Sequence, residues 1–143
     1  MSDSCKTYHQ NCLYFSANSL SRHINELAEQ ELSLTGLAPS YVYLLLSVIE
    51  EPGKCQNELS RIMNVKASTM TRFIDKLVFR KLVTKEQEGR NVLIYPTKEG
   101  NKMREPIHAA LKGLFERYCD LLGEDFALKL TENIHFANQQ FEK

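Results

Sequence analysis

Residues 56–80 read QNELSRIMNVKASTMTRFIDKLVFR, and this stretch decides the fold. The first eight residues place their apolar side chains on one face of a short helix, and Asn64-Val65 breaks it. From Lys66 to Arg80 a second helix carries an apolar stripe at helical spacing: Met70, Phe73, Ile74, Leu77 and Val78. Hydroxyls and basic side chains occupy the opposite face of this second helix. Such a pair is typical of a helix-turn-helix, although it also occurs in helical domains that bind no DNA.

A hairpin is predicted immediately after this pair. Segments 82–87 and 92–95 are short and rich in β-branched or aromatic residues, and they meet at Gly89. Pro96 cannot donate to a strand ladder, so it is expected to end its strand or to lie on an edge. A lone hairpin is marginally stable, so this one must pack against the helices. Helix-turn-helix followed by hairpin is the winged-helix order.

Charge is distributed unevenly along a chain whose formal net charge is zero. Between Lys54 and Arg104 there are twelve Lys or Arg against five Asp or Glu, a local charge of +7, and the flanks carry −7. A local basic field is the electrostatic footprint expected of nucleic-acid binding. A solvated positive face without a partner would look the same on charge alone.

Amphipathic helices are predicted at both ends of the chain. One is expected from about Cys5 to residue 33, and Pro39 then suits the first turn of a short buried helix ending near Ile49. Thr97 is a plausible N-cap for a long helix, in which Pro106 predicts a kink or break. The terminal apolar faces exceed what the centre can cover, so a second copy is expected to cover them; an intramolecular bundle is the alternative.

The predicted fold is therefore mainly α with a small β-hairpin (α+β), a winged helix-turn-helix with N- and C-terminal dimerisation helices. We expect a single domain over residues 1–143, with the DNA-binding lobe at about 38–98 and helical dimerisation regions at about 4–33 and 99–143. Neither a bilayer-spanning run nor a signal-peptide core is found, so we expect a cytoplasmic protein without membrane contact. Four cysteines without a CxxC pair and scattered histidines predict reduced thiols, no cofactor and no metal site.

From about Leu13 onward the chain resembles the MarR family of transcriptional regulators, which are prokaryotic winged-helix dimers. The similarity is strongest over ELSRIMNVKASTMTRFIDKLVFRKLV (residues 58–83) and in the hairpin EGRNVLIYPTKEG (residues 88–100). The usual wing pattern of the family is Asp-x-Arg, five residues, Leu-Thr, two residues and Gly. Here the matching positions are Glu88, Arg90, Pro96, Thr97 and Gly100.

Four departures from the family pattern stand out. Glu88 replaces Asp and lengthens the arm that would hold Arg90, and Pro96 replaces Leu. Lys81 stands where a glycine commonly follows the recognition helix, so the backbone conformation needed there is met less easily. The hairpin is also about three residues shorter than the common form, which affects how far it reaches along DNA.

The resemblance implies which residues meet DNA. In such proteins the second helix of the pair lies in the major groove, so the predicted contacts are Lys66, Ser68, Thr69, Thr71, Arg72 and Lys76. Arg72 could read a guanine in bidentate fashion, whereas Ser68 or Thr69 could instead cap the helix. Arg90 would lie in the adjacent minor groove or on its phosphates, with Gly89 making the turn and Glu88 supporting the arginine.

The family also commonly responds to aromatic acids or to oxidation of a cysteine. Residues that could line such an effector site are Tyr8, Cys12, Phe15, Tyr41 and Tyr43, and Cys12 resembles the sensing cysteine of the organic-peroxide-responsive branch. A packed interface would use the same residues, and we favour that alternative, because aromatic stripes at helical spacing are usually core.

The predicted function is thus a sequence-specific regulator, a homodimeric repressor of a pseudo-palindromic operator on double-stranded DNA, released by a small ligand or thiol oxidation. The alternative is a winged-helix module that binds protein. An enzyme is disfavoured, because the sequence has no recognisable nucleophile motif, Gly-rich phosphate loop or paired carboxylates.

Overall fold

The structure is a computed structural model that describes residues 9–143. The chain divides into two compact units. One comprises Leu32–Gly113, and the other combines the described residues up to Glu31 with Leu114–Lys143. Each unit is described by itself below.

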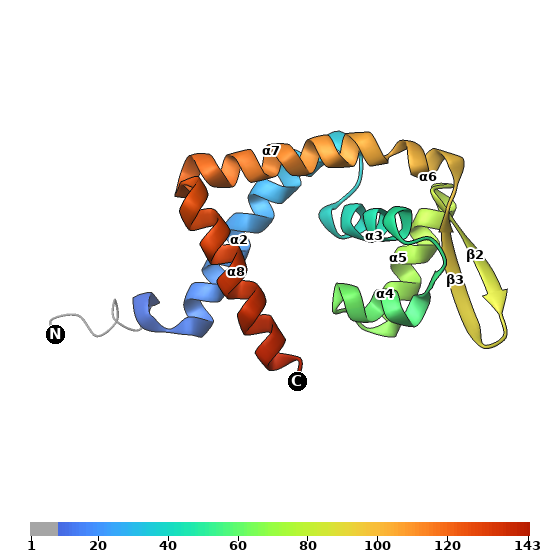
Figure 1. The fold of residues 1–143 in the computed structure, drawn as a ribbon, viewed down its shortest axis with the longest axis horizontal. Coiled ribbons are helices and arrows are strands. Elements are labelled where there is room, and N and C mark those ends of the chain that lie inside the picture. Colours follow the sequence, from blue (N-terminus) through green and yellow to red (C-terminus); the bar gives the residue numbers. More distant parts are fainter. Residues whose placement is uncertain (1–8) are drawn as a thin grey trace, which may run out of the picture. The chain divides into compact units, whose positions relative to one another are not determined.

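The Leu32–Gly113 unit contains the predicted helix-turn-helix and hairpin (Figure 1). Its elements are η1 (Ser33–Thr35), α3 (Pro39–Glu50), β1 (Lys54–Cys55), α4 (Gln56–Met63), α5 (Ala67–Phe79), β2 (Val83–Glu88), β3 (Asn91–Pro96), α6 (Lys98–Lys102) and the first part of α7 (Arg104–Leu122). The winged-helix order is therefore confirmed. Pro39 occupies the first turn of α3, as predicted.

One apolar core holds this unit together. α3 supplies Leu44 and Leu45, α4 supplies Leu59, and α5 supplies Met70 and Ile74, all fully buried. Each such side chain stabilises the fold by about 1.5–3 kcal/mol through removal of apolar surface from water. The predicted stripe of α5 is thus confirmed at its centre, while its flanking positions Phe73 and Val78 are half-buried.

The sheet has three strands rather than the two predicted. β1 pairs antiparallel with β3, with Lys54 opposite Ile94, so β3 lies in the centre of the order β1-β3-β2. Two residues carry no periodicity, so β1 could not be recognised from the sequence. The Lys54 ammonium lies 2.7 Å from a Glu51 carboxylate oxygen and 3.4 Å from Glu58. The hydrogen bond to Glu51 chiefly raises the pKa of Lys54, so β1 carries a cation fixed between two carboxylates.

The β2–β3 hairpin is regular from base to tip. Val83 pairs with Pro96 at the base and Glu88 with Asn91 at the tip, leaving a two-residue loop of Gly89 and Arg90. Gly89 has φ +62°, the positive value that the first loop position of a type II′ turn requires. Pro96 ends β3, as predicted.

The base of the hairpin is tied to the start of α6 by hydrogen bonds around Thr97. The Thr97 hydroxyl donates to the Lys81 carbonyl at 2.7 Å and accepts from the Gly100 backbone N–H at 2.9 Å. The Thr97 backbone N–H donates to the Leu82 carbonyl at 3.0 Å. Thr97 is therefore the N-cap that the sequence predicts, and it also fixes the turn after α5.

The long helix predicted from Thr97 is interrupted, as Pro106 indicates. α6 ends at Lys102, Met103 lies between the helices, and α7 begins at Arg104. Pro106 then sits in the first turn of α7, where its missing N–H leaves no intrahelical hydrogen bond unmade.

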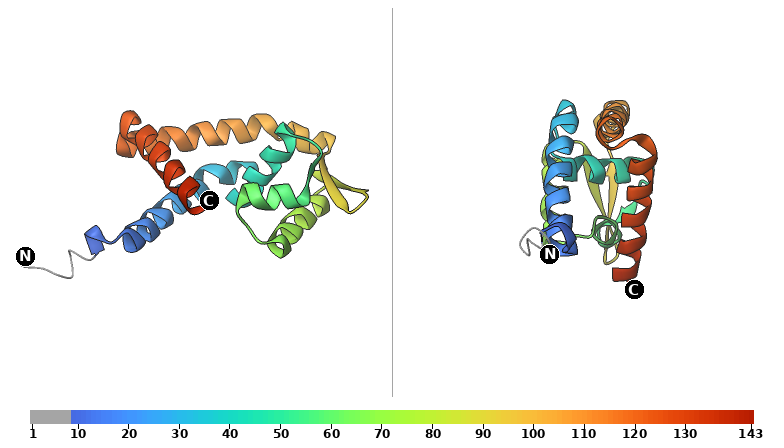
Figure 2. Two further views of the ribbon diagram at one scale, coloured as in Figure 1. Left: turned by 60° about the horizontal axis from the view of Figure 1, so that its bottom comes forward. Right: turned by 90° about the vertical axis from the view of Figure 1, so that its left-hand side faces the viewer.

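The second unit consists of α2 (Leu13–Leu32), the later part of α7 and α8 (Glu124–Phe141), with Leu32 itself belonging to the first unit. The Arg117 guanidinium of α7 lies 2.8 Å from the Glu31 carboxylate of α2. α2 and α8 lie side by side (Figure 2). Their side chains line a shared hollow of about 440 Å³. Its apolar wall includes Leu13, Leu20, Ile24, Leu130 and Ile134.

The N-terminal helix differs from the prediction. Cys5 and Tyr8 lie outside the described residues, and α2 begins only at Leu13. Residues 9–11 are helical, but Cys12 is not, so the continuous helix expected through Cys12 is wrong.

No single helix among residues 9–143 is long and apolar enough to cross a membrane. A bent pair, Leu13–Thr35 with Pro39–Glu50, reaches the required length and composition only when both halves are counted. The second half is α3, in which Val42, Leu44, Leu45, Val48 and Ile49 are buried.

Gly100 is expected to tolerate no side chain. A Cβ built there would lie 2.0 Å from the Leu82 carbonyl oxygen. That oxygen belongs to the backbone, so it cannot move aside as the end of a flexible side chain could. Gly100→Ala should therefore lower the free energy of unfolding by about 3 kcal/mol, because the hairpin base must move. Chemical denaturation measures this, with Lys98→Ala on the exposed side of α6 as the control. A Gly100→Ala protein as stable as the control would contradict the contact.

Lys81 occupies a position that favours glycine, as the sequence indicates. Its φ is +63°, and the N–H groups of Lys81 and Leu82 donate to the carbonyls of Val78 and Leu77, which is the Schellman pattern at a helix C-terminus. Lys81→Gly should raise the free energy of unfolding by about 0.5–1 kcal/mol, since it relieves the left-handed backbone. Lys81→Ala removes the same charge and keeps the strain, so it should give no gain. Equal effects of both changes would contradict this interpretation.

Candidate nucleic-acid interface

A short turn after α4 and burial of one face of α5 together leave the opposite face of α5 exposed to solvent. Asn64 closes α4 with φ +54°, and Lys66, in extended conformation, is the N-cap of α5. Neither Ser68 nor Thr69 caps the helix, because both lie within its first turn. The capping alternative considered from the sequence is therefore wrong, and both hydroxyls remain candidates for DNA contact.

Most of the predicted contact residues are exposed together on this face. Ser68, Thr71, Arg72 and Lys76 are exposed, and Thr69 is half-buried. Lys66 is also exposed, just before the helix begins. Helical spacing thus presents hydroxyls and positive charges along one side of α5, as the sequence predicts. That these side chains touch DNA stays a prediction.

Tyr41 of α3 packs beside this face. Its ring centroid lies 5.0 Å from that of Phe73, and the Lys76 ammonium lies 5.0 Å from the centre of the Tyr41 ring. A cation over an aromatic face gains about 0.5–1 kcal/mol at exposed sites. Tyr41 therefore helps to hold Lys76 in place. Tyr41, one of the predicted effector residues, thus lies against α5.

An ion pair joins α5 to the hairpin. The Lys85 ammonium of β2 lies 2.7 Å from a carboxylate oxygen of Asp75. Asp75 is the acidic residue of α5, so Lys85 neutralises the negative charge on the exposed face of that helix. Lys85 could not be recognised from sequence patterns, because its partner lies ten residues away and belongs to a different element.

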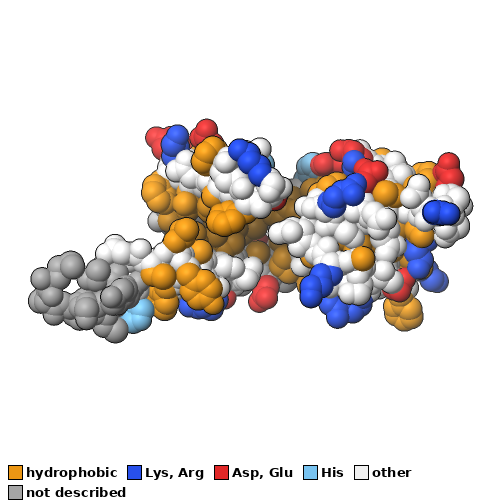
Figure 3. All heavy atoms as spheres, turned by 90° about the horizontal axis from the view of Figure 1, so that it is seen from below, with side chains coloured by type: hydrophobic (Ala, Val, Ile, Leu, Met, Phe, Trp, Pro, Cys, Tyr) orange, Lys and Arg blue, Asp and Glu red, His pale blue; other side chains and the backbone are white. Residues whose placement is uncertain are grey.

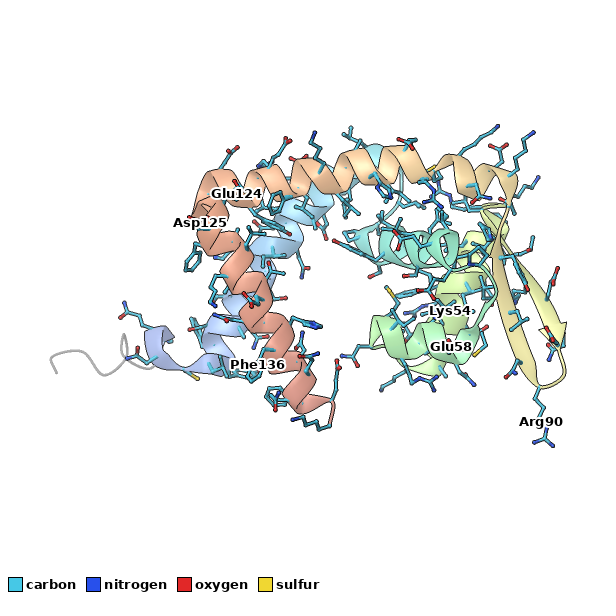
Figure 4. All side chains as sticks on the ribbon, in the orientation of Figure 1. Lys54, Glu58, Arg90, Glu124, Asp125 and Phe136 are labelled. Carbon is cyan, nitrogen blue, oxygen red and sulfur yellow. The ribbon has the colours of Figure 1, made fainter. Side chains whose placement is uncertain are left out.

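Arg90 lies at the tip of the hairpin and points away from the protein (Figure 4). Within residues 9–143, no ion pair or hydrogen bond joins it to Glu88. The side-chain amide of Gln87 instead donates to the Gly89 carbonyl at 2.9 Å. The expected support by Glu88 is thus not formed here, and Gln87 holds the turn. Gln87 and Gly89 are only two residues apart, so this hydrogen bond is a local one that the sequence of the turn could have suggested.

The predicted effector residues do not form a common core. Tyr8 lies outside the described residues. Cys12 is exposed, and Phe15 is 42% exposed and stacks on His9 with ring centroids 4.6 Å apart. Tyr43 is 44% exposed, and partial burial raises its pKa. Cys12, Phe15 and Tyr43 are thus not buried within the described part of the chain, and the packed interface that we favoured for them stays a prediction.

The described cysteines differ in chemistry. Cys12, Cys55 and Cys119 are free thiols. Desolvation raises the pKa of Cys119, and the carboxylates of Glu124, Asp120 and Glu116 raise it further. The raised pKa lowers the fraction of Cys119 present as thiolate, which makes Cys119 less reactive than an unperturbed cysteine, because the thiolate is the nucleophile. Among residues 9–143 no group of three His, Cys, Asp or Glu side chains is placed to hold a metal ion.

Large apolar side chains remain exposed on the unit that contains α2 and α8 (Figure 3). They include Leu13 and Tyr14 of α2, Leu121 of α7, and Phe126, Phe136 and Phe141 of α8. Leu121 is 66% exposed. Exposed apolar area of this extent marks an interaction surface.

No protein-family model matches this sequence, and no curated protein shows significant similarity to it. Solved structures do match. A MarR-family transcriptional regulator from Rhodococcus sp. RHA1 is 21% identical over 87% of this chain and 91% of its own, with a TM-score of 0.79. The repressor CouR of Rhodococcus jostii RHA1, bound to a 23-mer DNA duplex, is 17% identical over 92% and 95%, with a TM-score of 0.85. A mutant MarR from E. coli, complexed with operator DNA, is 19% identical over 91% and 96%, with a TM-score of 0.80.

The chain therefore has the fold of MarR-family transcriptional regulators. The resemblance inferred from the residues of the recognition helix and wing is confirmed at the level of the fold.

Proposed function

We propose that this protein is a sequence-specific DNA-binding transcriptional regulator. The observation that carries the proposal is the exposed polar face of α5, which is flanked by the hairpin with Arg90 at its tip, within the +7 segment. A helix of this kind fits the major groove, where side chains near its N-terminus meet base edges. Arg90 then reaches the adjacent minor groove or its phosphates. CouR and MarR, which share the fold, are both described in complex with DNA.

The regulator acts as a homodimer in this proposal. The exposed apolar side chains of α2 and α8 need a cover, and a second copy presents the same surface. Two recognition helices related by a two-fold axis would read a pseudo-palindromic site with half-sites roughly 34 Å apart. Repression follows if the site overlaps a promoter, and a protein of this kind acts where the chromosome is, in the cytoplasm of a prokaryote.

Release from DNA is the second part of the proposal. CouR is described bound to DNA in one structure and to p-coumaroyl-CoA in another, so one protein of this fold takes both partners. A small aromatic ligand is therefore one candidate signal for this chain, with Tyr41 and Tyr43 as candidate contacts. Oxidation of the exposed Cys12 thiol is the other.

Selection of bound duplexes from a random pool tests function and symmetry together. We expect a palindromic consensus whose half-sites are about one helical turn apart. Recovery of no consensus would favour the alternative, a winged-helix module that binds another protein.

Replacement of the hairpin arginine tests the role of the wing. Arg90→Ala should weaken binding and flatten its dependence on salt, with the slope falling by about one phosphate contact. Affinity measured at several salt concentrations gives both quantities. Lys112→Ala, an exposed lysine on α7 outside the proposed surface, is the matched control. An unchanged affinity and slope for Arg90→Ala would remove Arg90 from the interface.

Peroxide treatment distinguishes the two signals. Peroxide should release the wild-type protein from its selected duplex and leave Cys12→Ser bound, because Cys12 is the exposed thiol among residues 9–143. Cys119→Ser should respond like the wild type, since the raised pKa keeps Cys119 protonated. Release of Cys12→Ser by peroxide would exclude this cysteine as the sensor and leave the ligand as the signal.

A further inference from the structure

A single hydrogen bond connects the two helices of the helix-turn-helix on their exposed side. The side-chain amide of Gln56, the first residue of α4, donates to the Thr71 hydroxyl at 2.7 Å. The Thr71 hydroxyl in turn donates to the Ala67 carbonyl one turn earlier in α5, at 3.1 Å. The two side chains are fifteen residues apart in sequence, and both are polar without charge.

Gln56 is itself anchored by the helix that carries it. Its backbone carbonyl accepts a hydrogen bond from the Ser60 hydroxyl at 3.2 Å, and the next turn of α4 is fixed by Leu59, which is fully buried. The amide therefore approaches Thr71 from a rigid element, whereas Thr71 stands on the exposed face of α5.

These two hydrogen bonds determine what Thr71 can offer. A threonine hydroxyl has one proton and two lone pairs. The proton is directed to Ala67 and one lone pair is taken by Gln56, so one lone pair and the methyl group remain. Thr71 can accept a hydrogen bond or make an apolar contact, but it has no proton left to donate.

We propose that Gln56 is a positioning residue that fixes Thr71 as an acceptor and methyl contact for a base edge. This inference rests on the proposed function, because it concerns the same face of α5. In the major groove guanine presents acceptors at N7 and O6, which a side chain without a free proton cannot satisfy. Adenine N6 and cytosine N4 are both amino donors, but only an A·T pair presents a donor together with the thymine methyl group. Thr71 held in this way selects an A·T pair and disfavours guanine.

A purely structural role for Gln56 makes a different prediction. If the hydrogen bond only braces α4 against α5, its loss lowers stability and weakens binding to every duplex alike. If it sets the orientation of Thr71, its loss changes the preference at one base pair in each half-site. Base preference is therefore the quantity that separates the two roles.

The test is selection from a random duplex pool with wild type, Gln56→Met, Thr71→Ser and the double variant. Gln56→Met keeps the length of the side chain and cannot donate, while Thr71→Ser keeps the hydroxyl and removes the methyl. We expect both changes to relax the preference for A·T at the same base pair, by roughly three- to tenfold, as one lost contact would. The double variant should relax it little further, since the residues act as a unit. Asn57→Ala, an exposed amide on the next position of α4, should leave that preference unchanged.

Two results would overturn the inference while leaving the proposed function intact. One is an unchanged consensus for Gln56→Met with affinity lowered equally for all duplexes. The other is a change at different base pairs for Gln56→Met and Thr71→Ser. A wild-type protein that selects no consensus would overturn the proposed function and this inference together, so the failures are distinguishable. Thermal unfolding of each variant confirms that it is folded when selected.

Discussion

The close approach of Gly100 to the Leu82 carbonyl is the constraint on which the arrangement of α5, the hairpin and α6 depends. A side chain at residue 100 would overlap that oxygen, so only glycine lets the start of α6 lie against the turn after α5. Thr97 then closes this junction with hydrogen bonds to the Lys81 and Leu82 carbonyls. One compact contact thereby fixes the end of α5, both ends of the hairpin and the start of α6. The left-handed backbone at Lys81 is the local cost of that turn.

The exposed face of α5 is ordered by neighbours from several other elements. Gln56 holds Thr71, Tyr41 lies under Lys76, and Lys85 pairs with Asp75. Each of these interactions is worth little in free energy at an exposed surface. Their shared consequence is orientation, because a side chain that is already fixed loses less entropy when it meets a base or phosphate. Arg90, by contrast, extends from the hairpin tip without an ion pair in the described part of the chain, which suits a contact made only on DNA.

Local patterns explain which elements could be predicted. The stripe of α5, the N-cap at Thr97 and the break before Pro106 each depend on residues within a turn or two of one another, so the sequence contained the whole cause. β1 was missed because two residues become a strand only when β3 lies beside them. The exposure of the candidate effector residues illustrates a related point. Helical spacing shows that side chains share a face, but the structure decides whether anything covers that face, and Cys12 and Phe15 are exposed.

The sequence by itself determined the winged-helix order and the basic segment, because helical period, turn chemistry and charge are local properties, and the family resemblance added the candidate DNA-binding residues. Tertiary structure alone decided how those residues are presented. It placed Gln56 against Thr71 and Lys85 against Asp75, pairs that lie fifteen and ten residues apart. It also put Gln87, rather than Glu88, on the carbonyl of the turn beside Arg90. The physical reason is that hydrogen bonds and ion pairs are set by distance in space, which burial of Leu59, Ile74 and the rest of the core establishes.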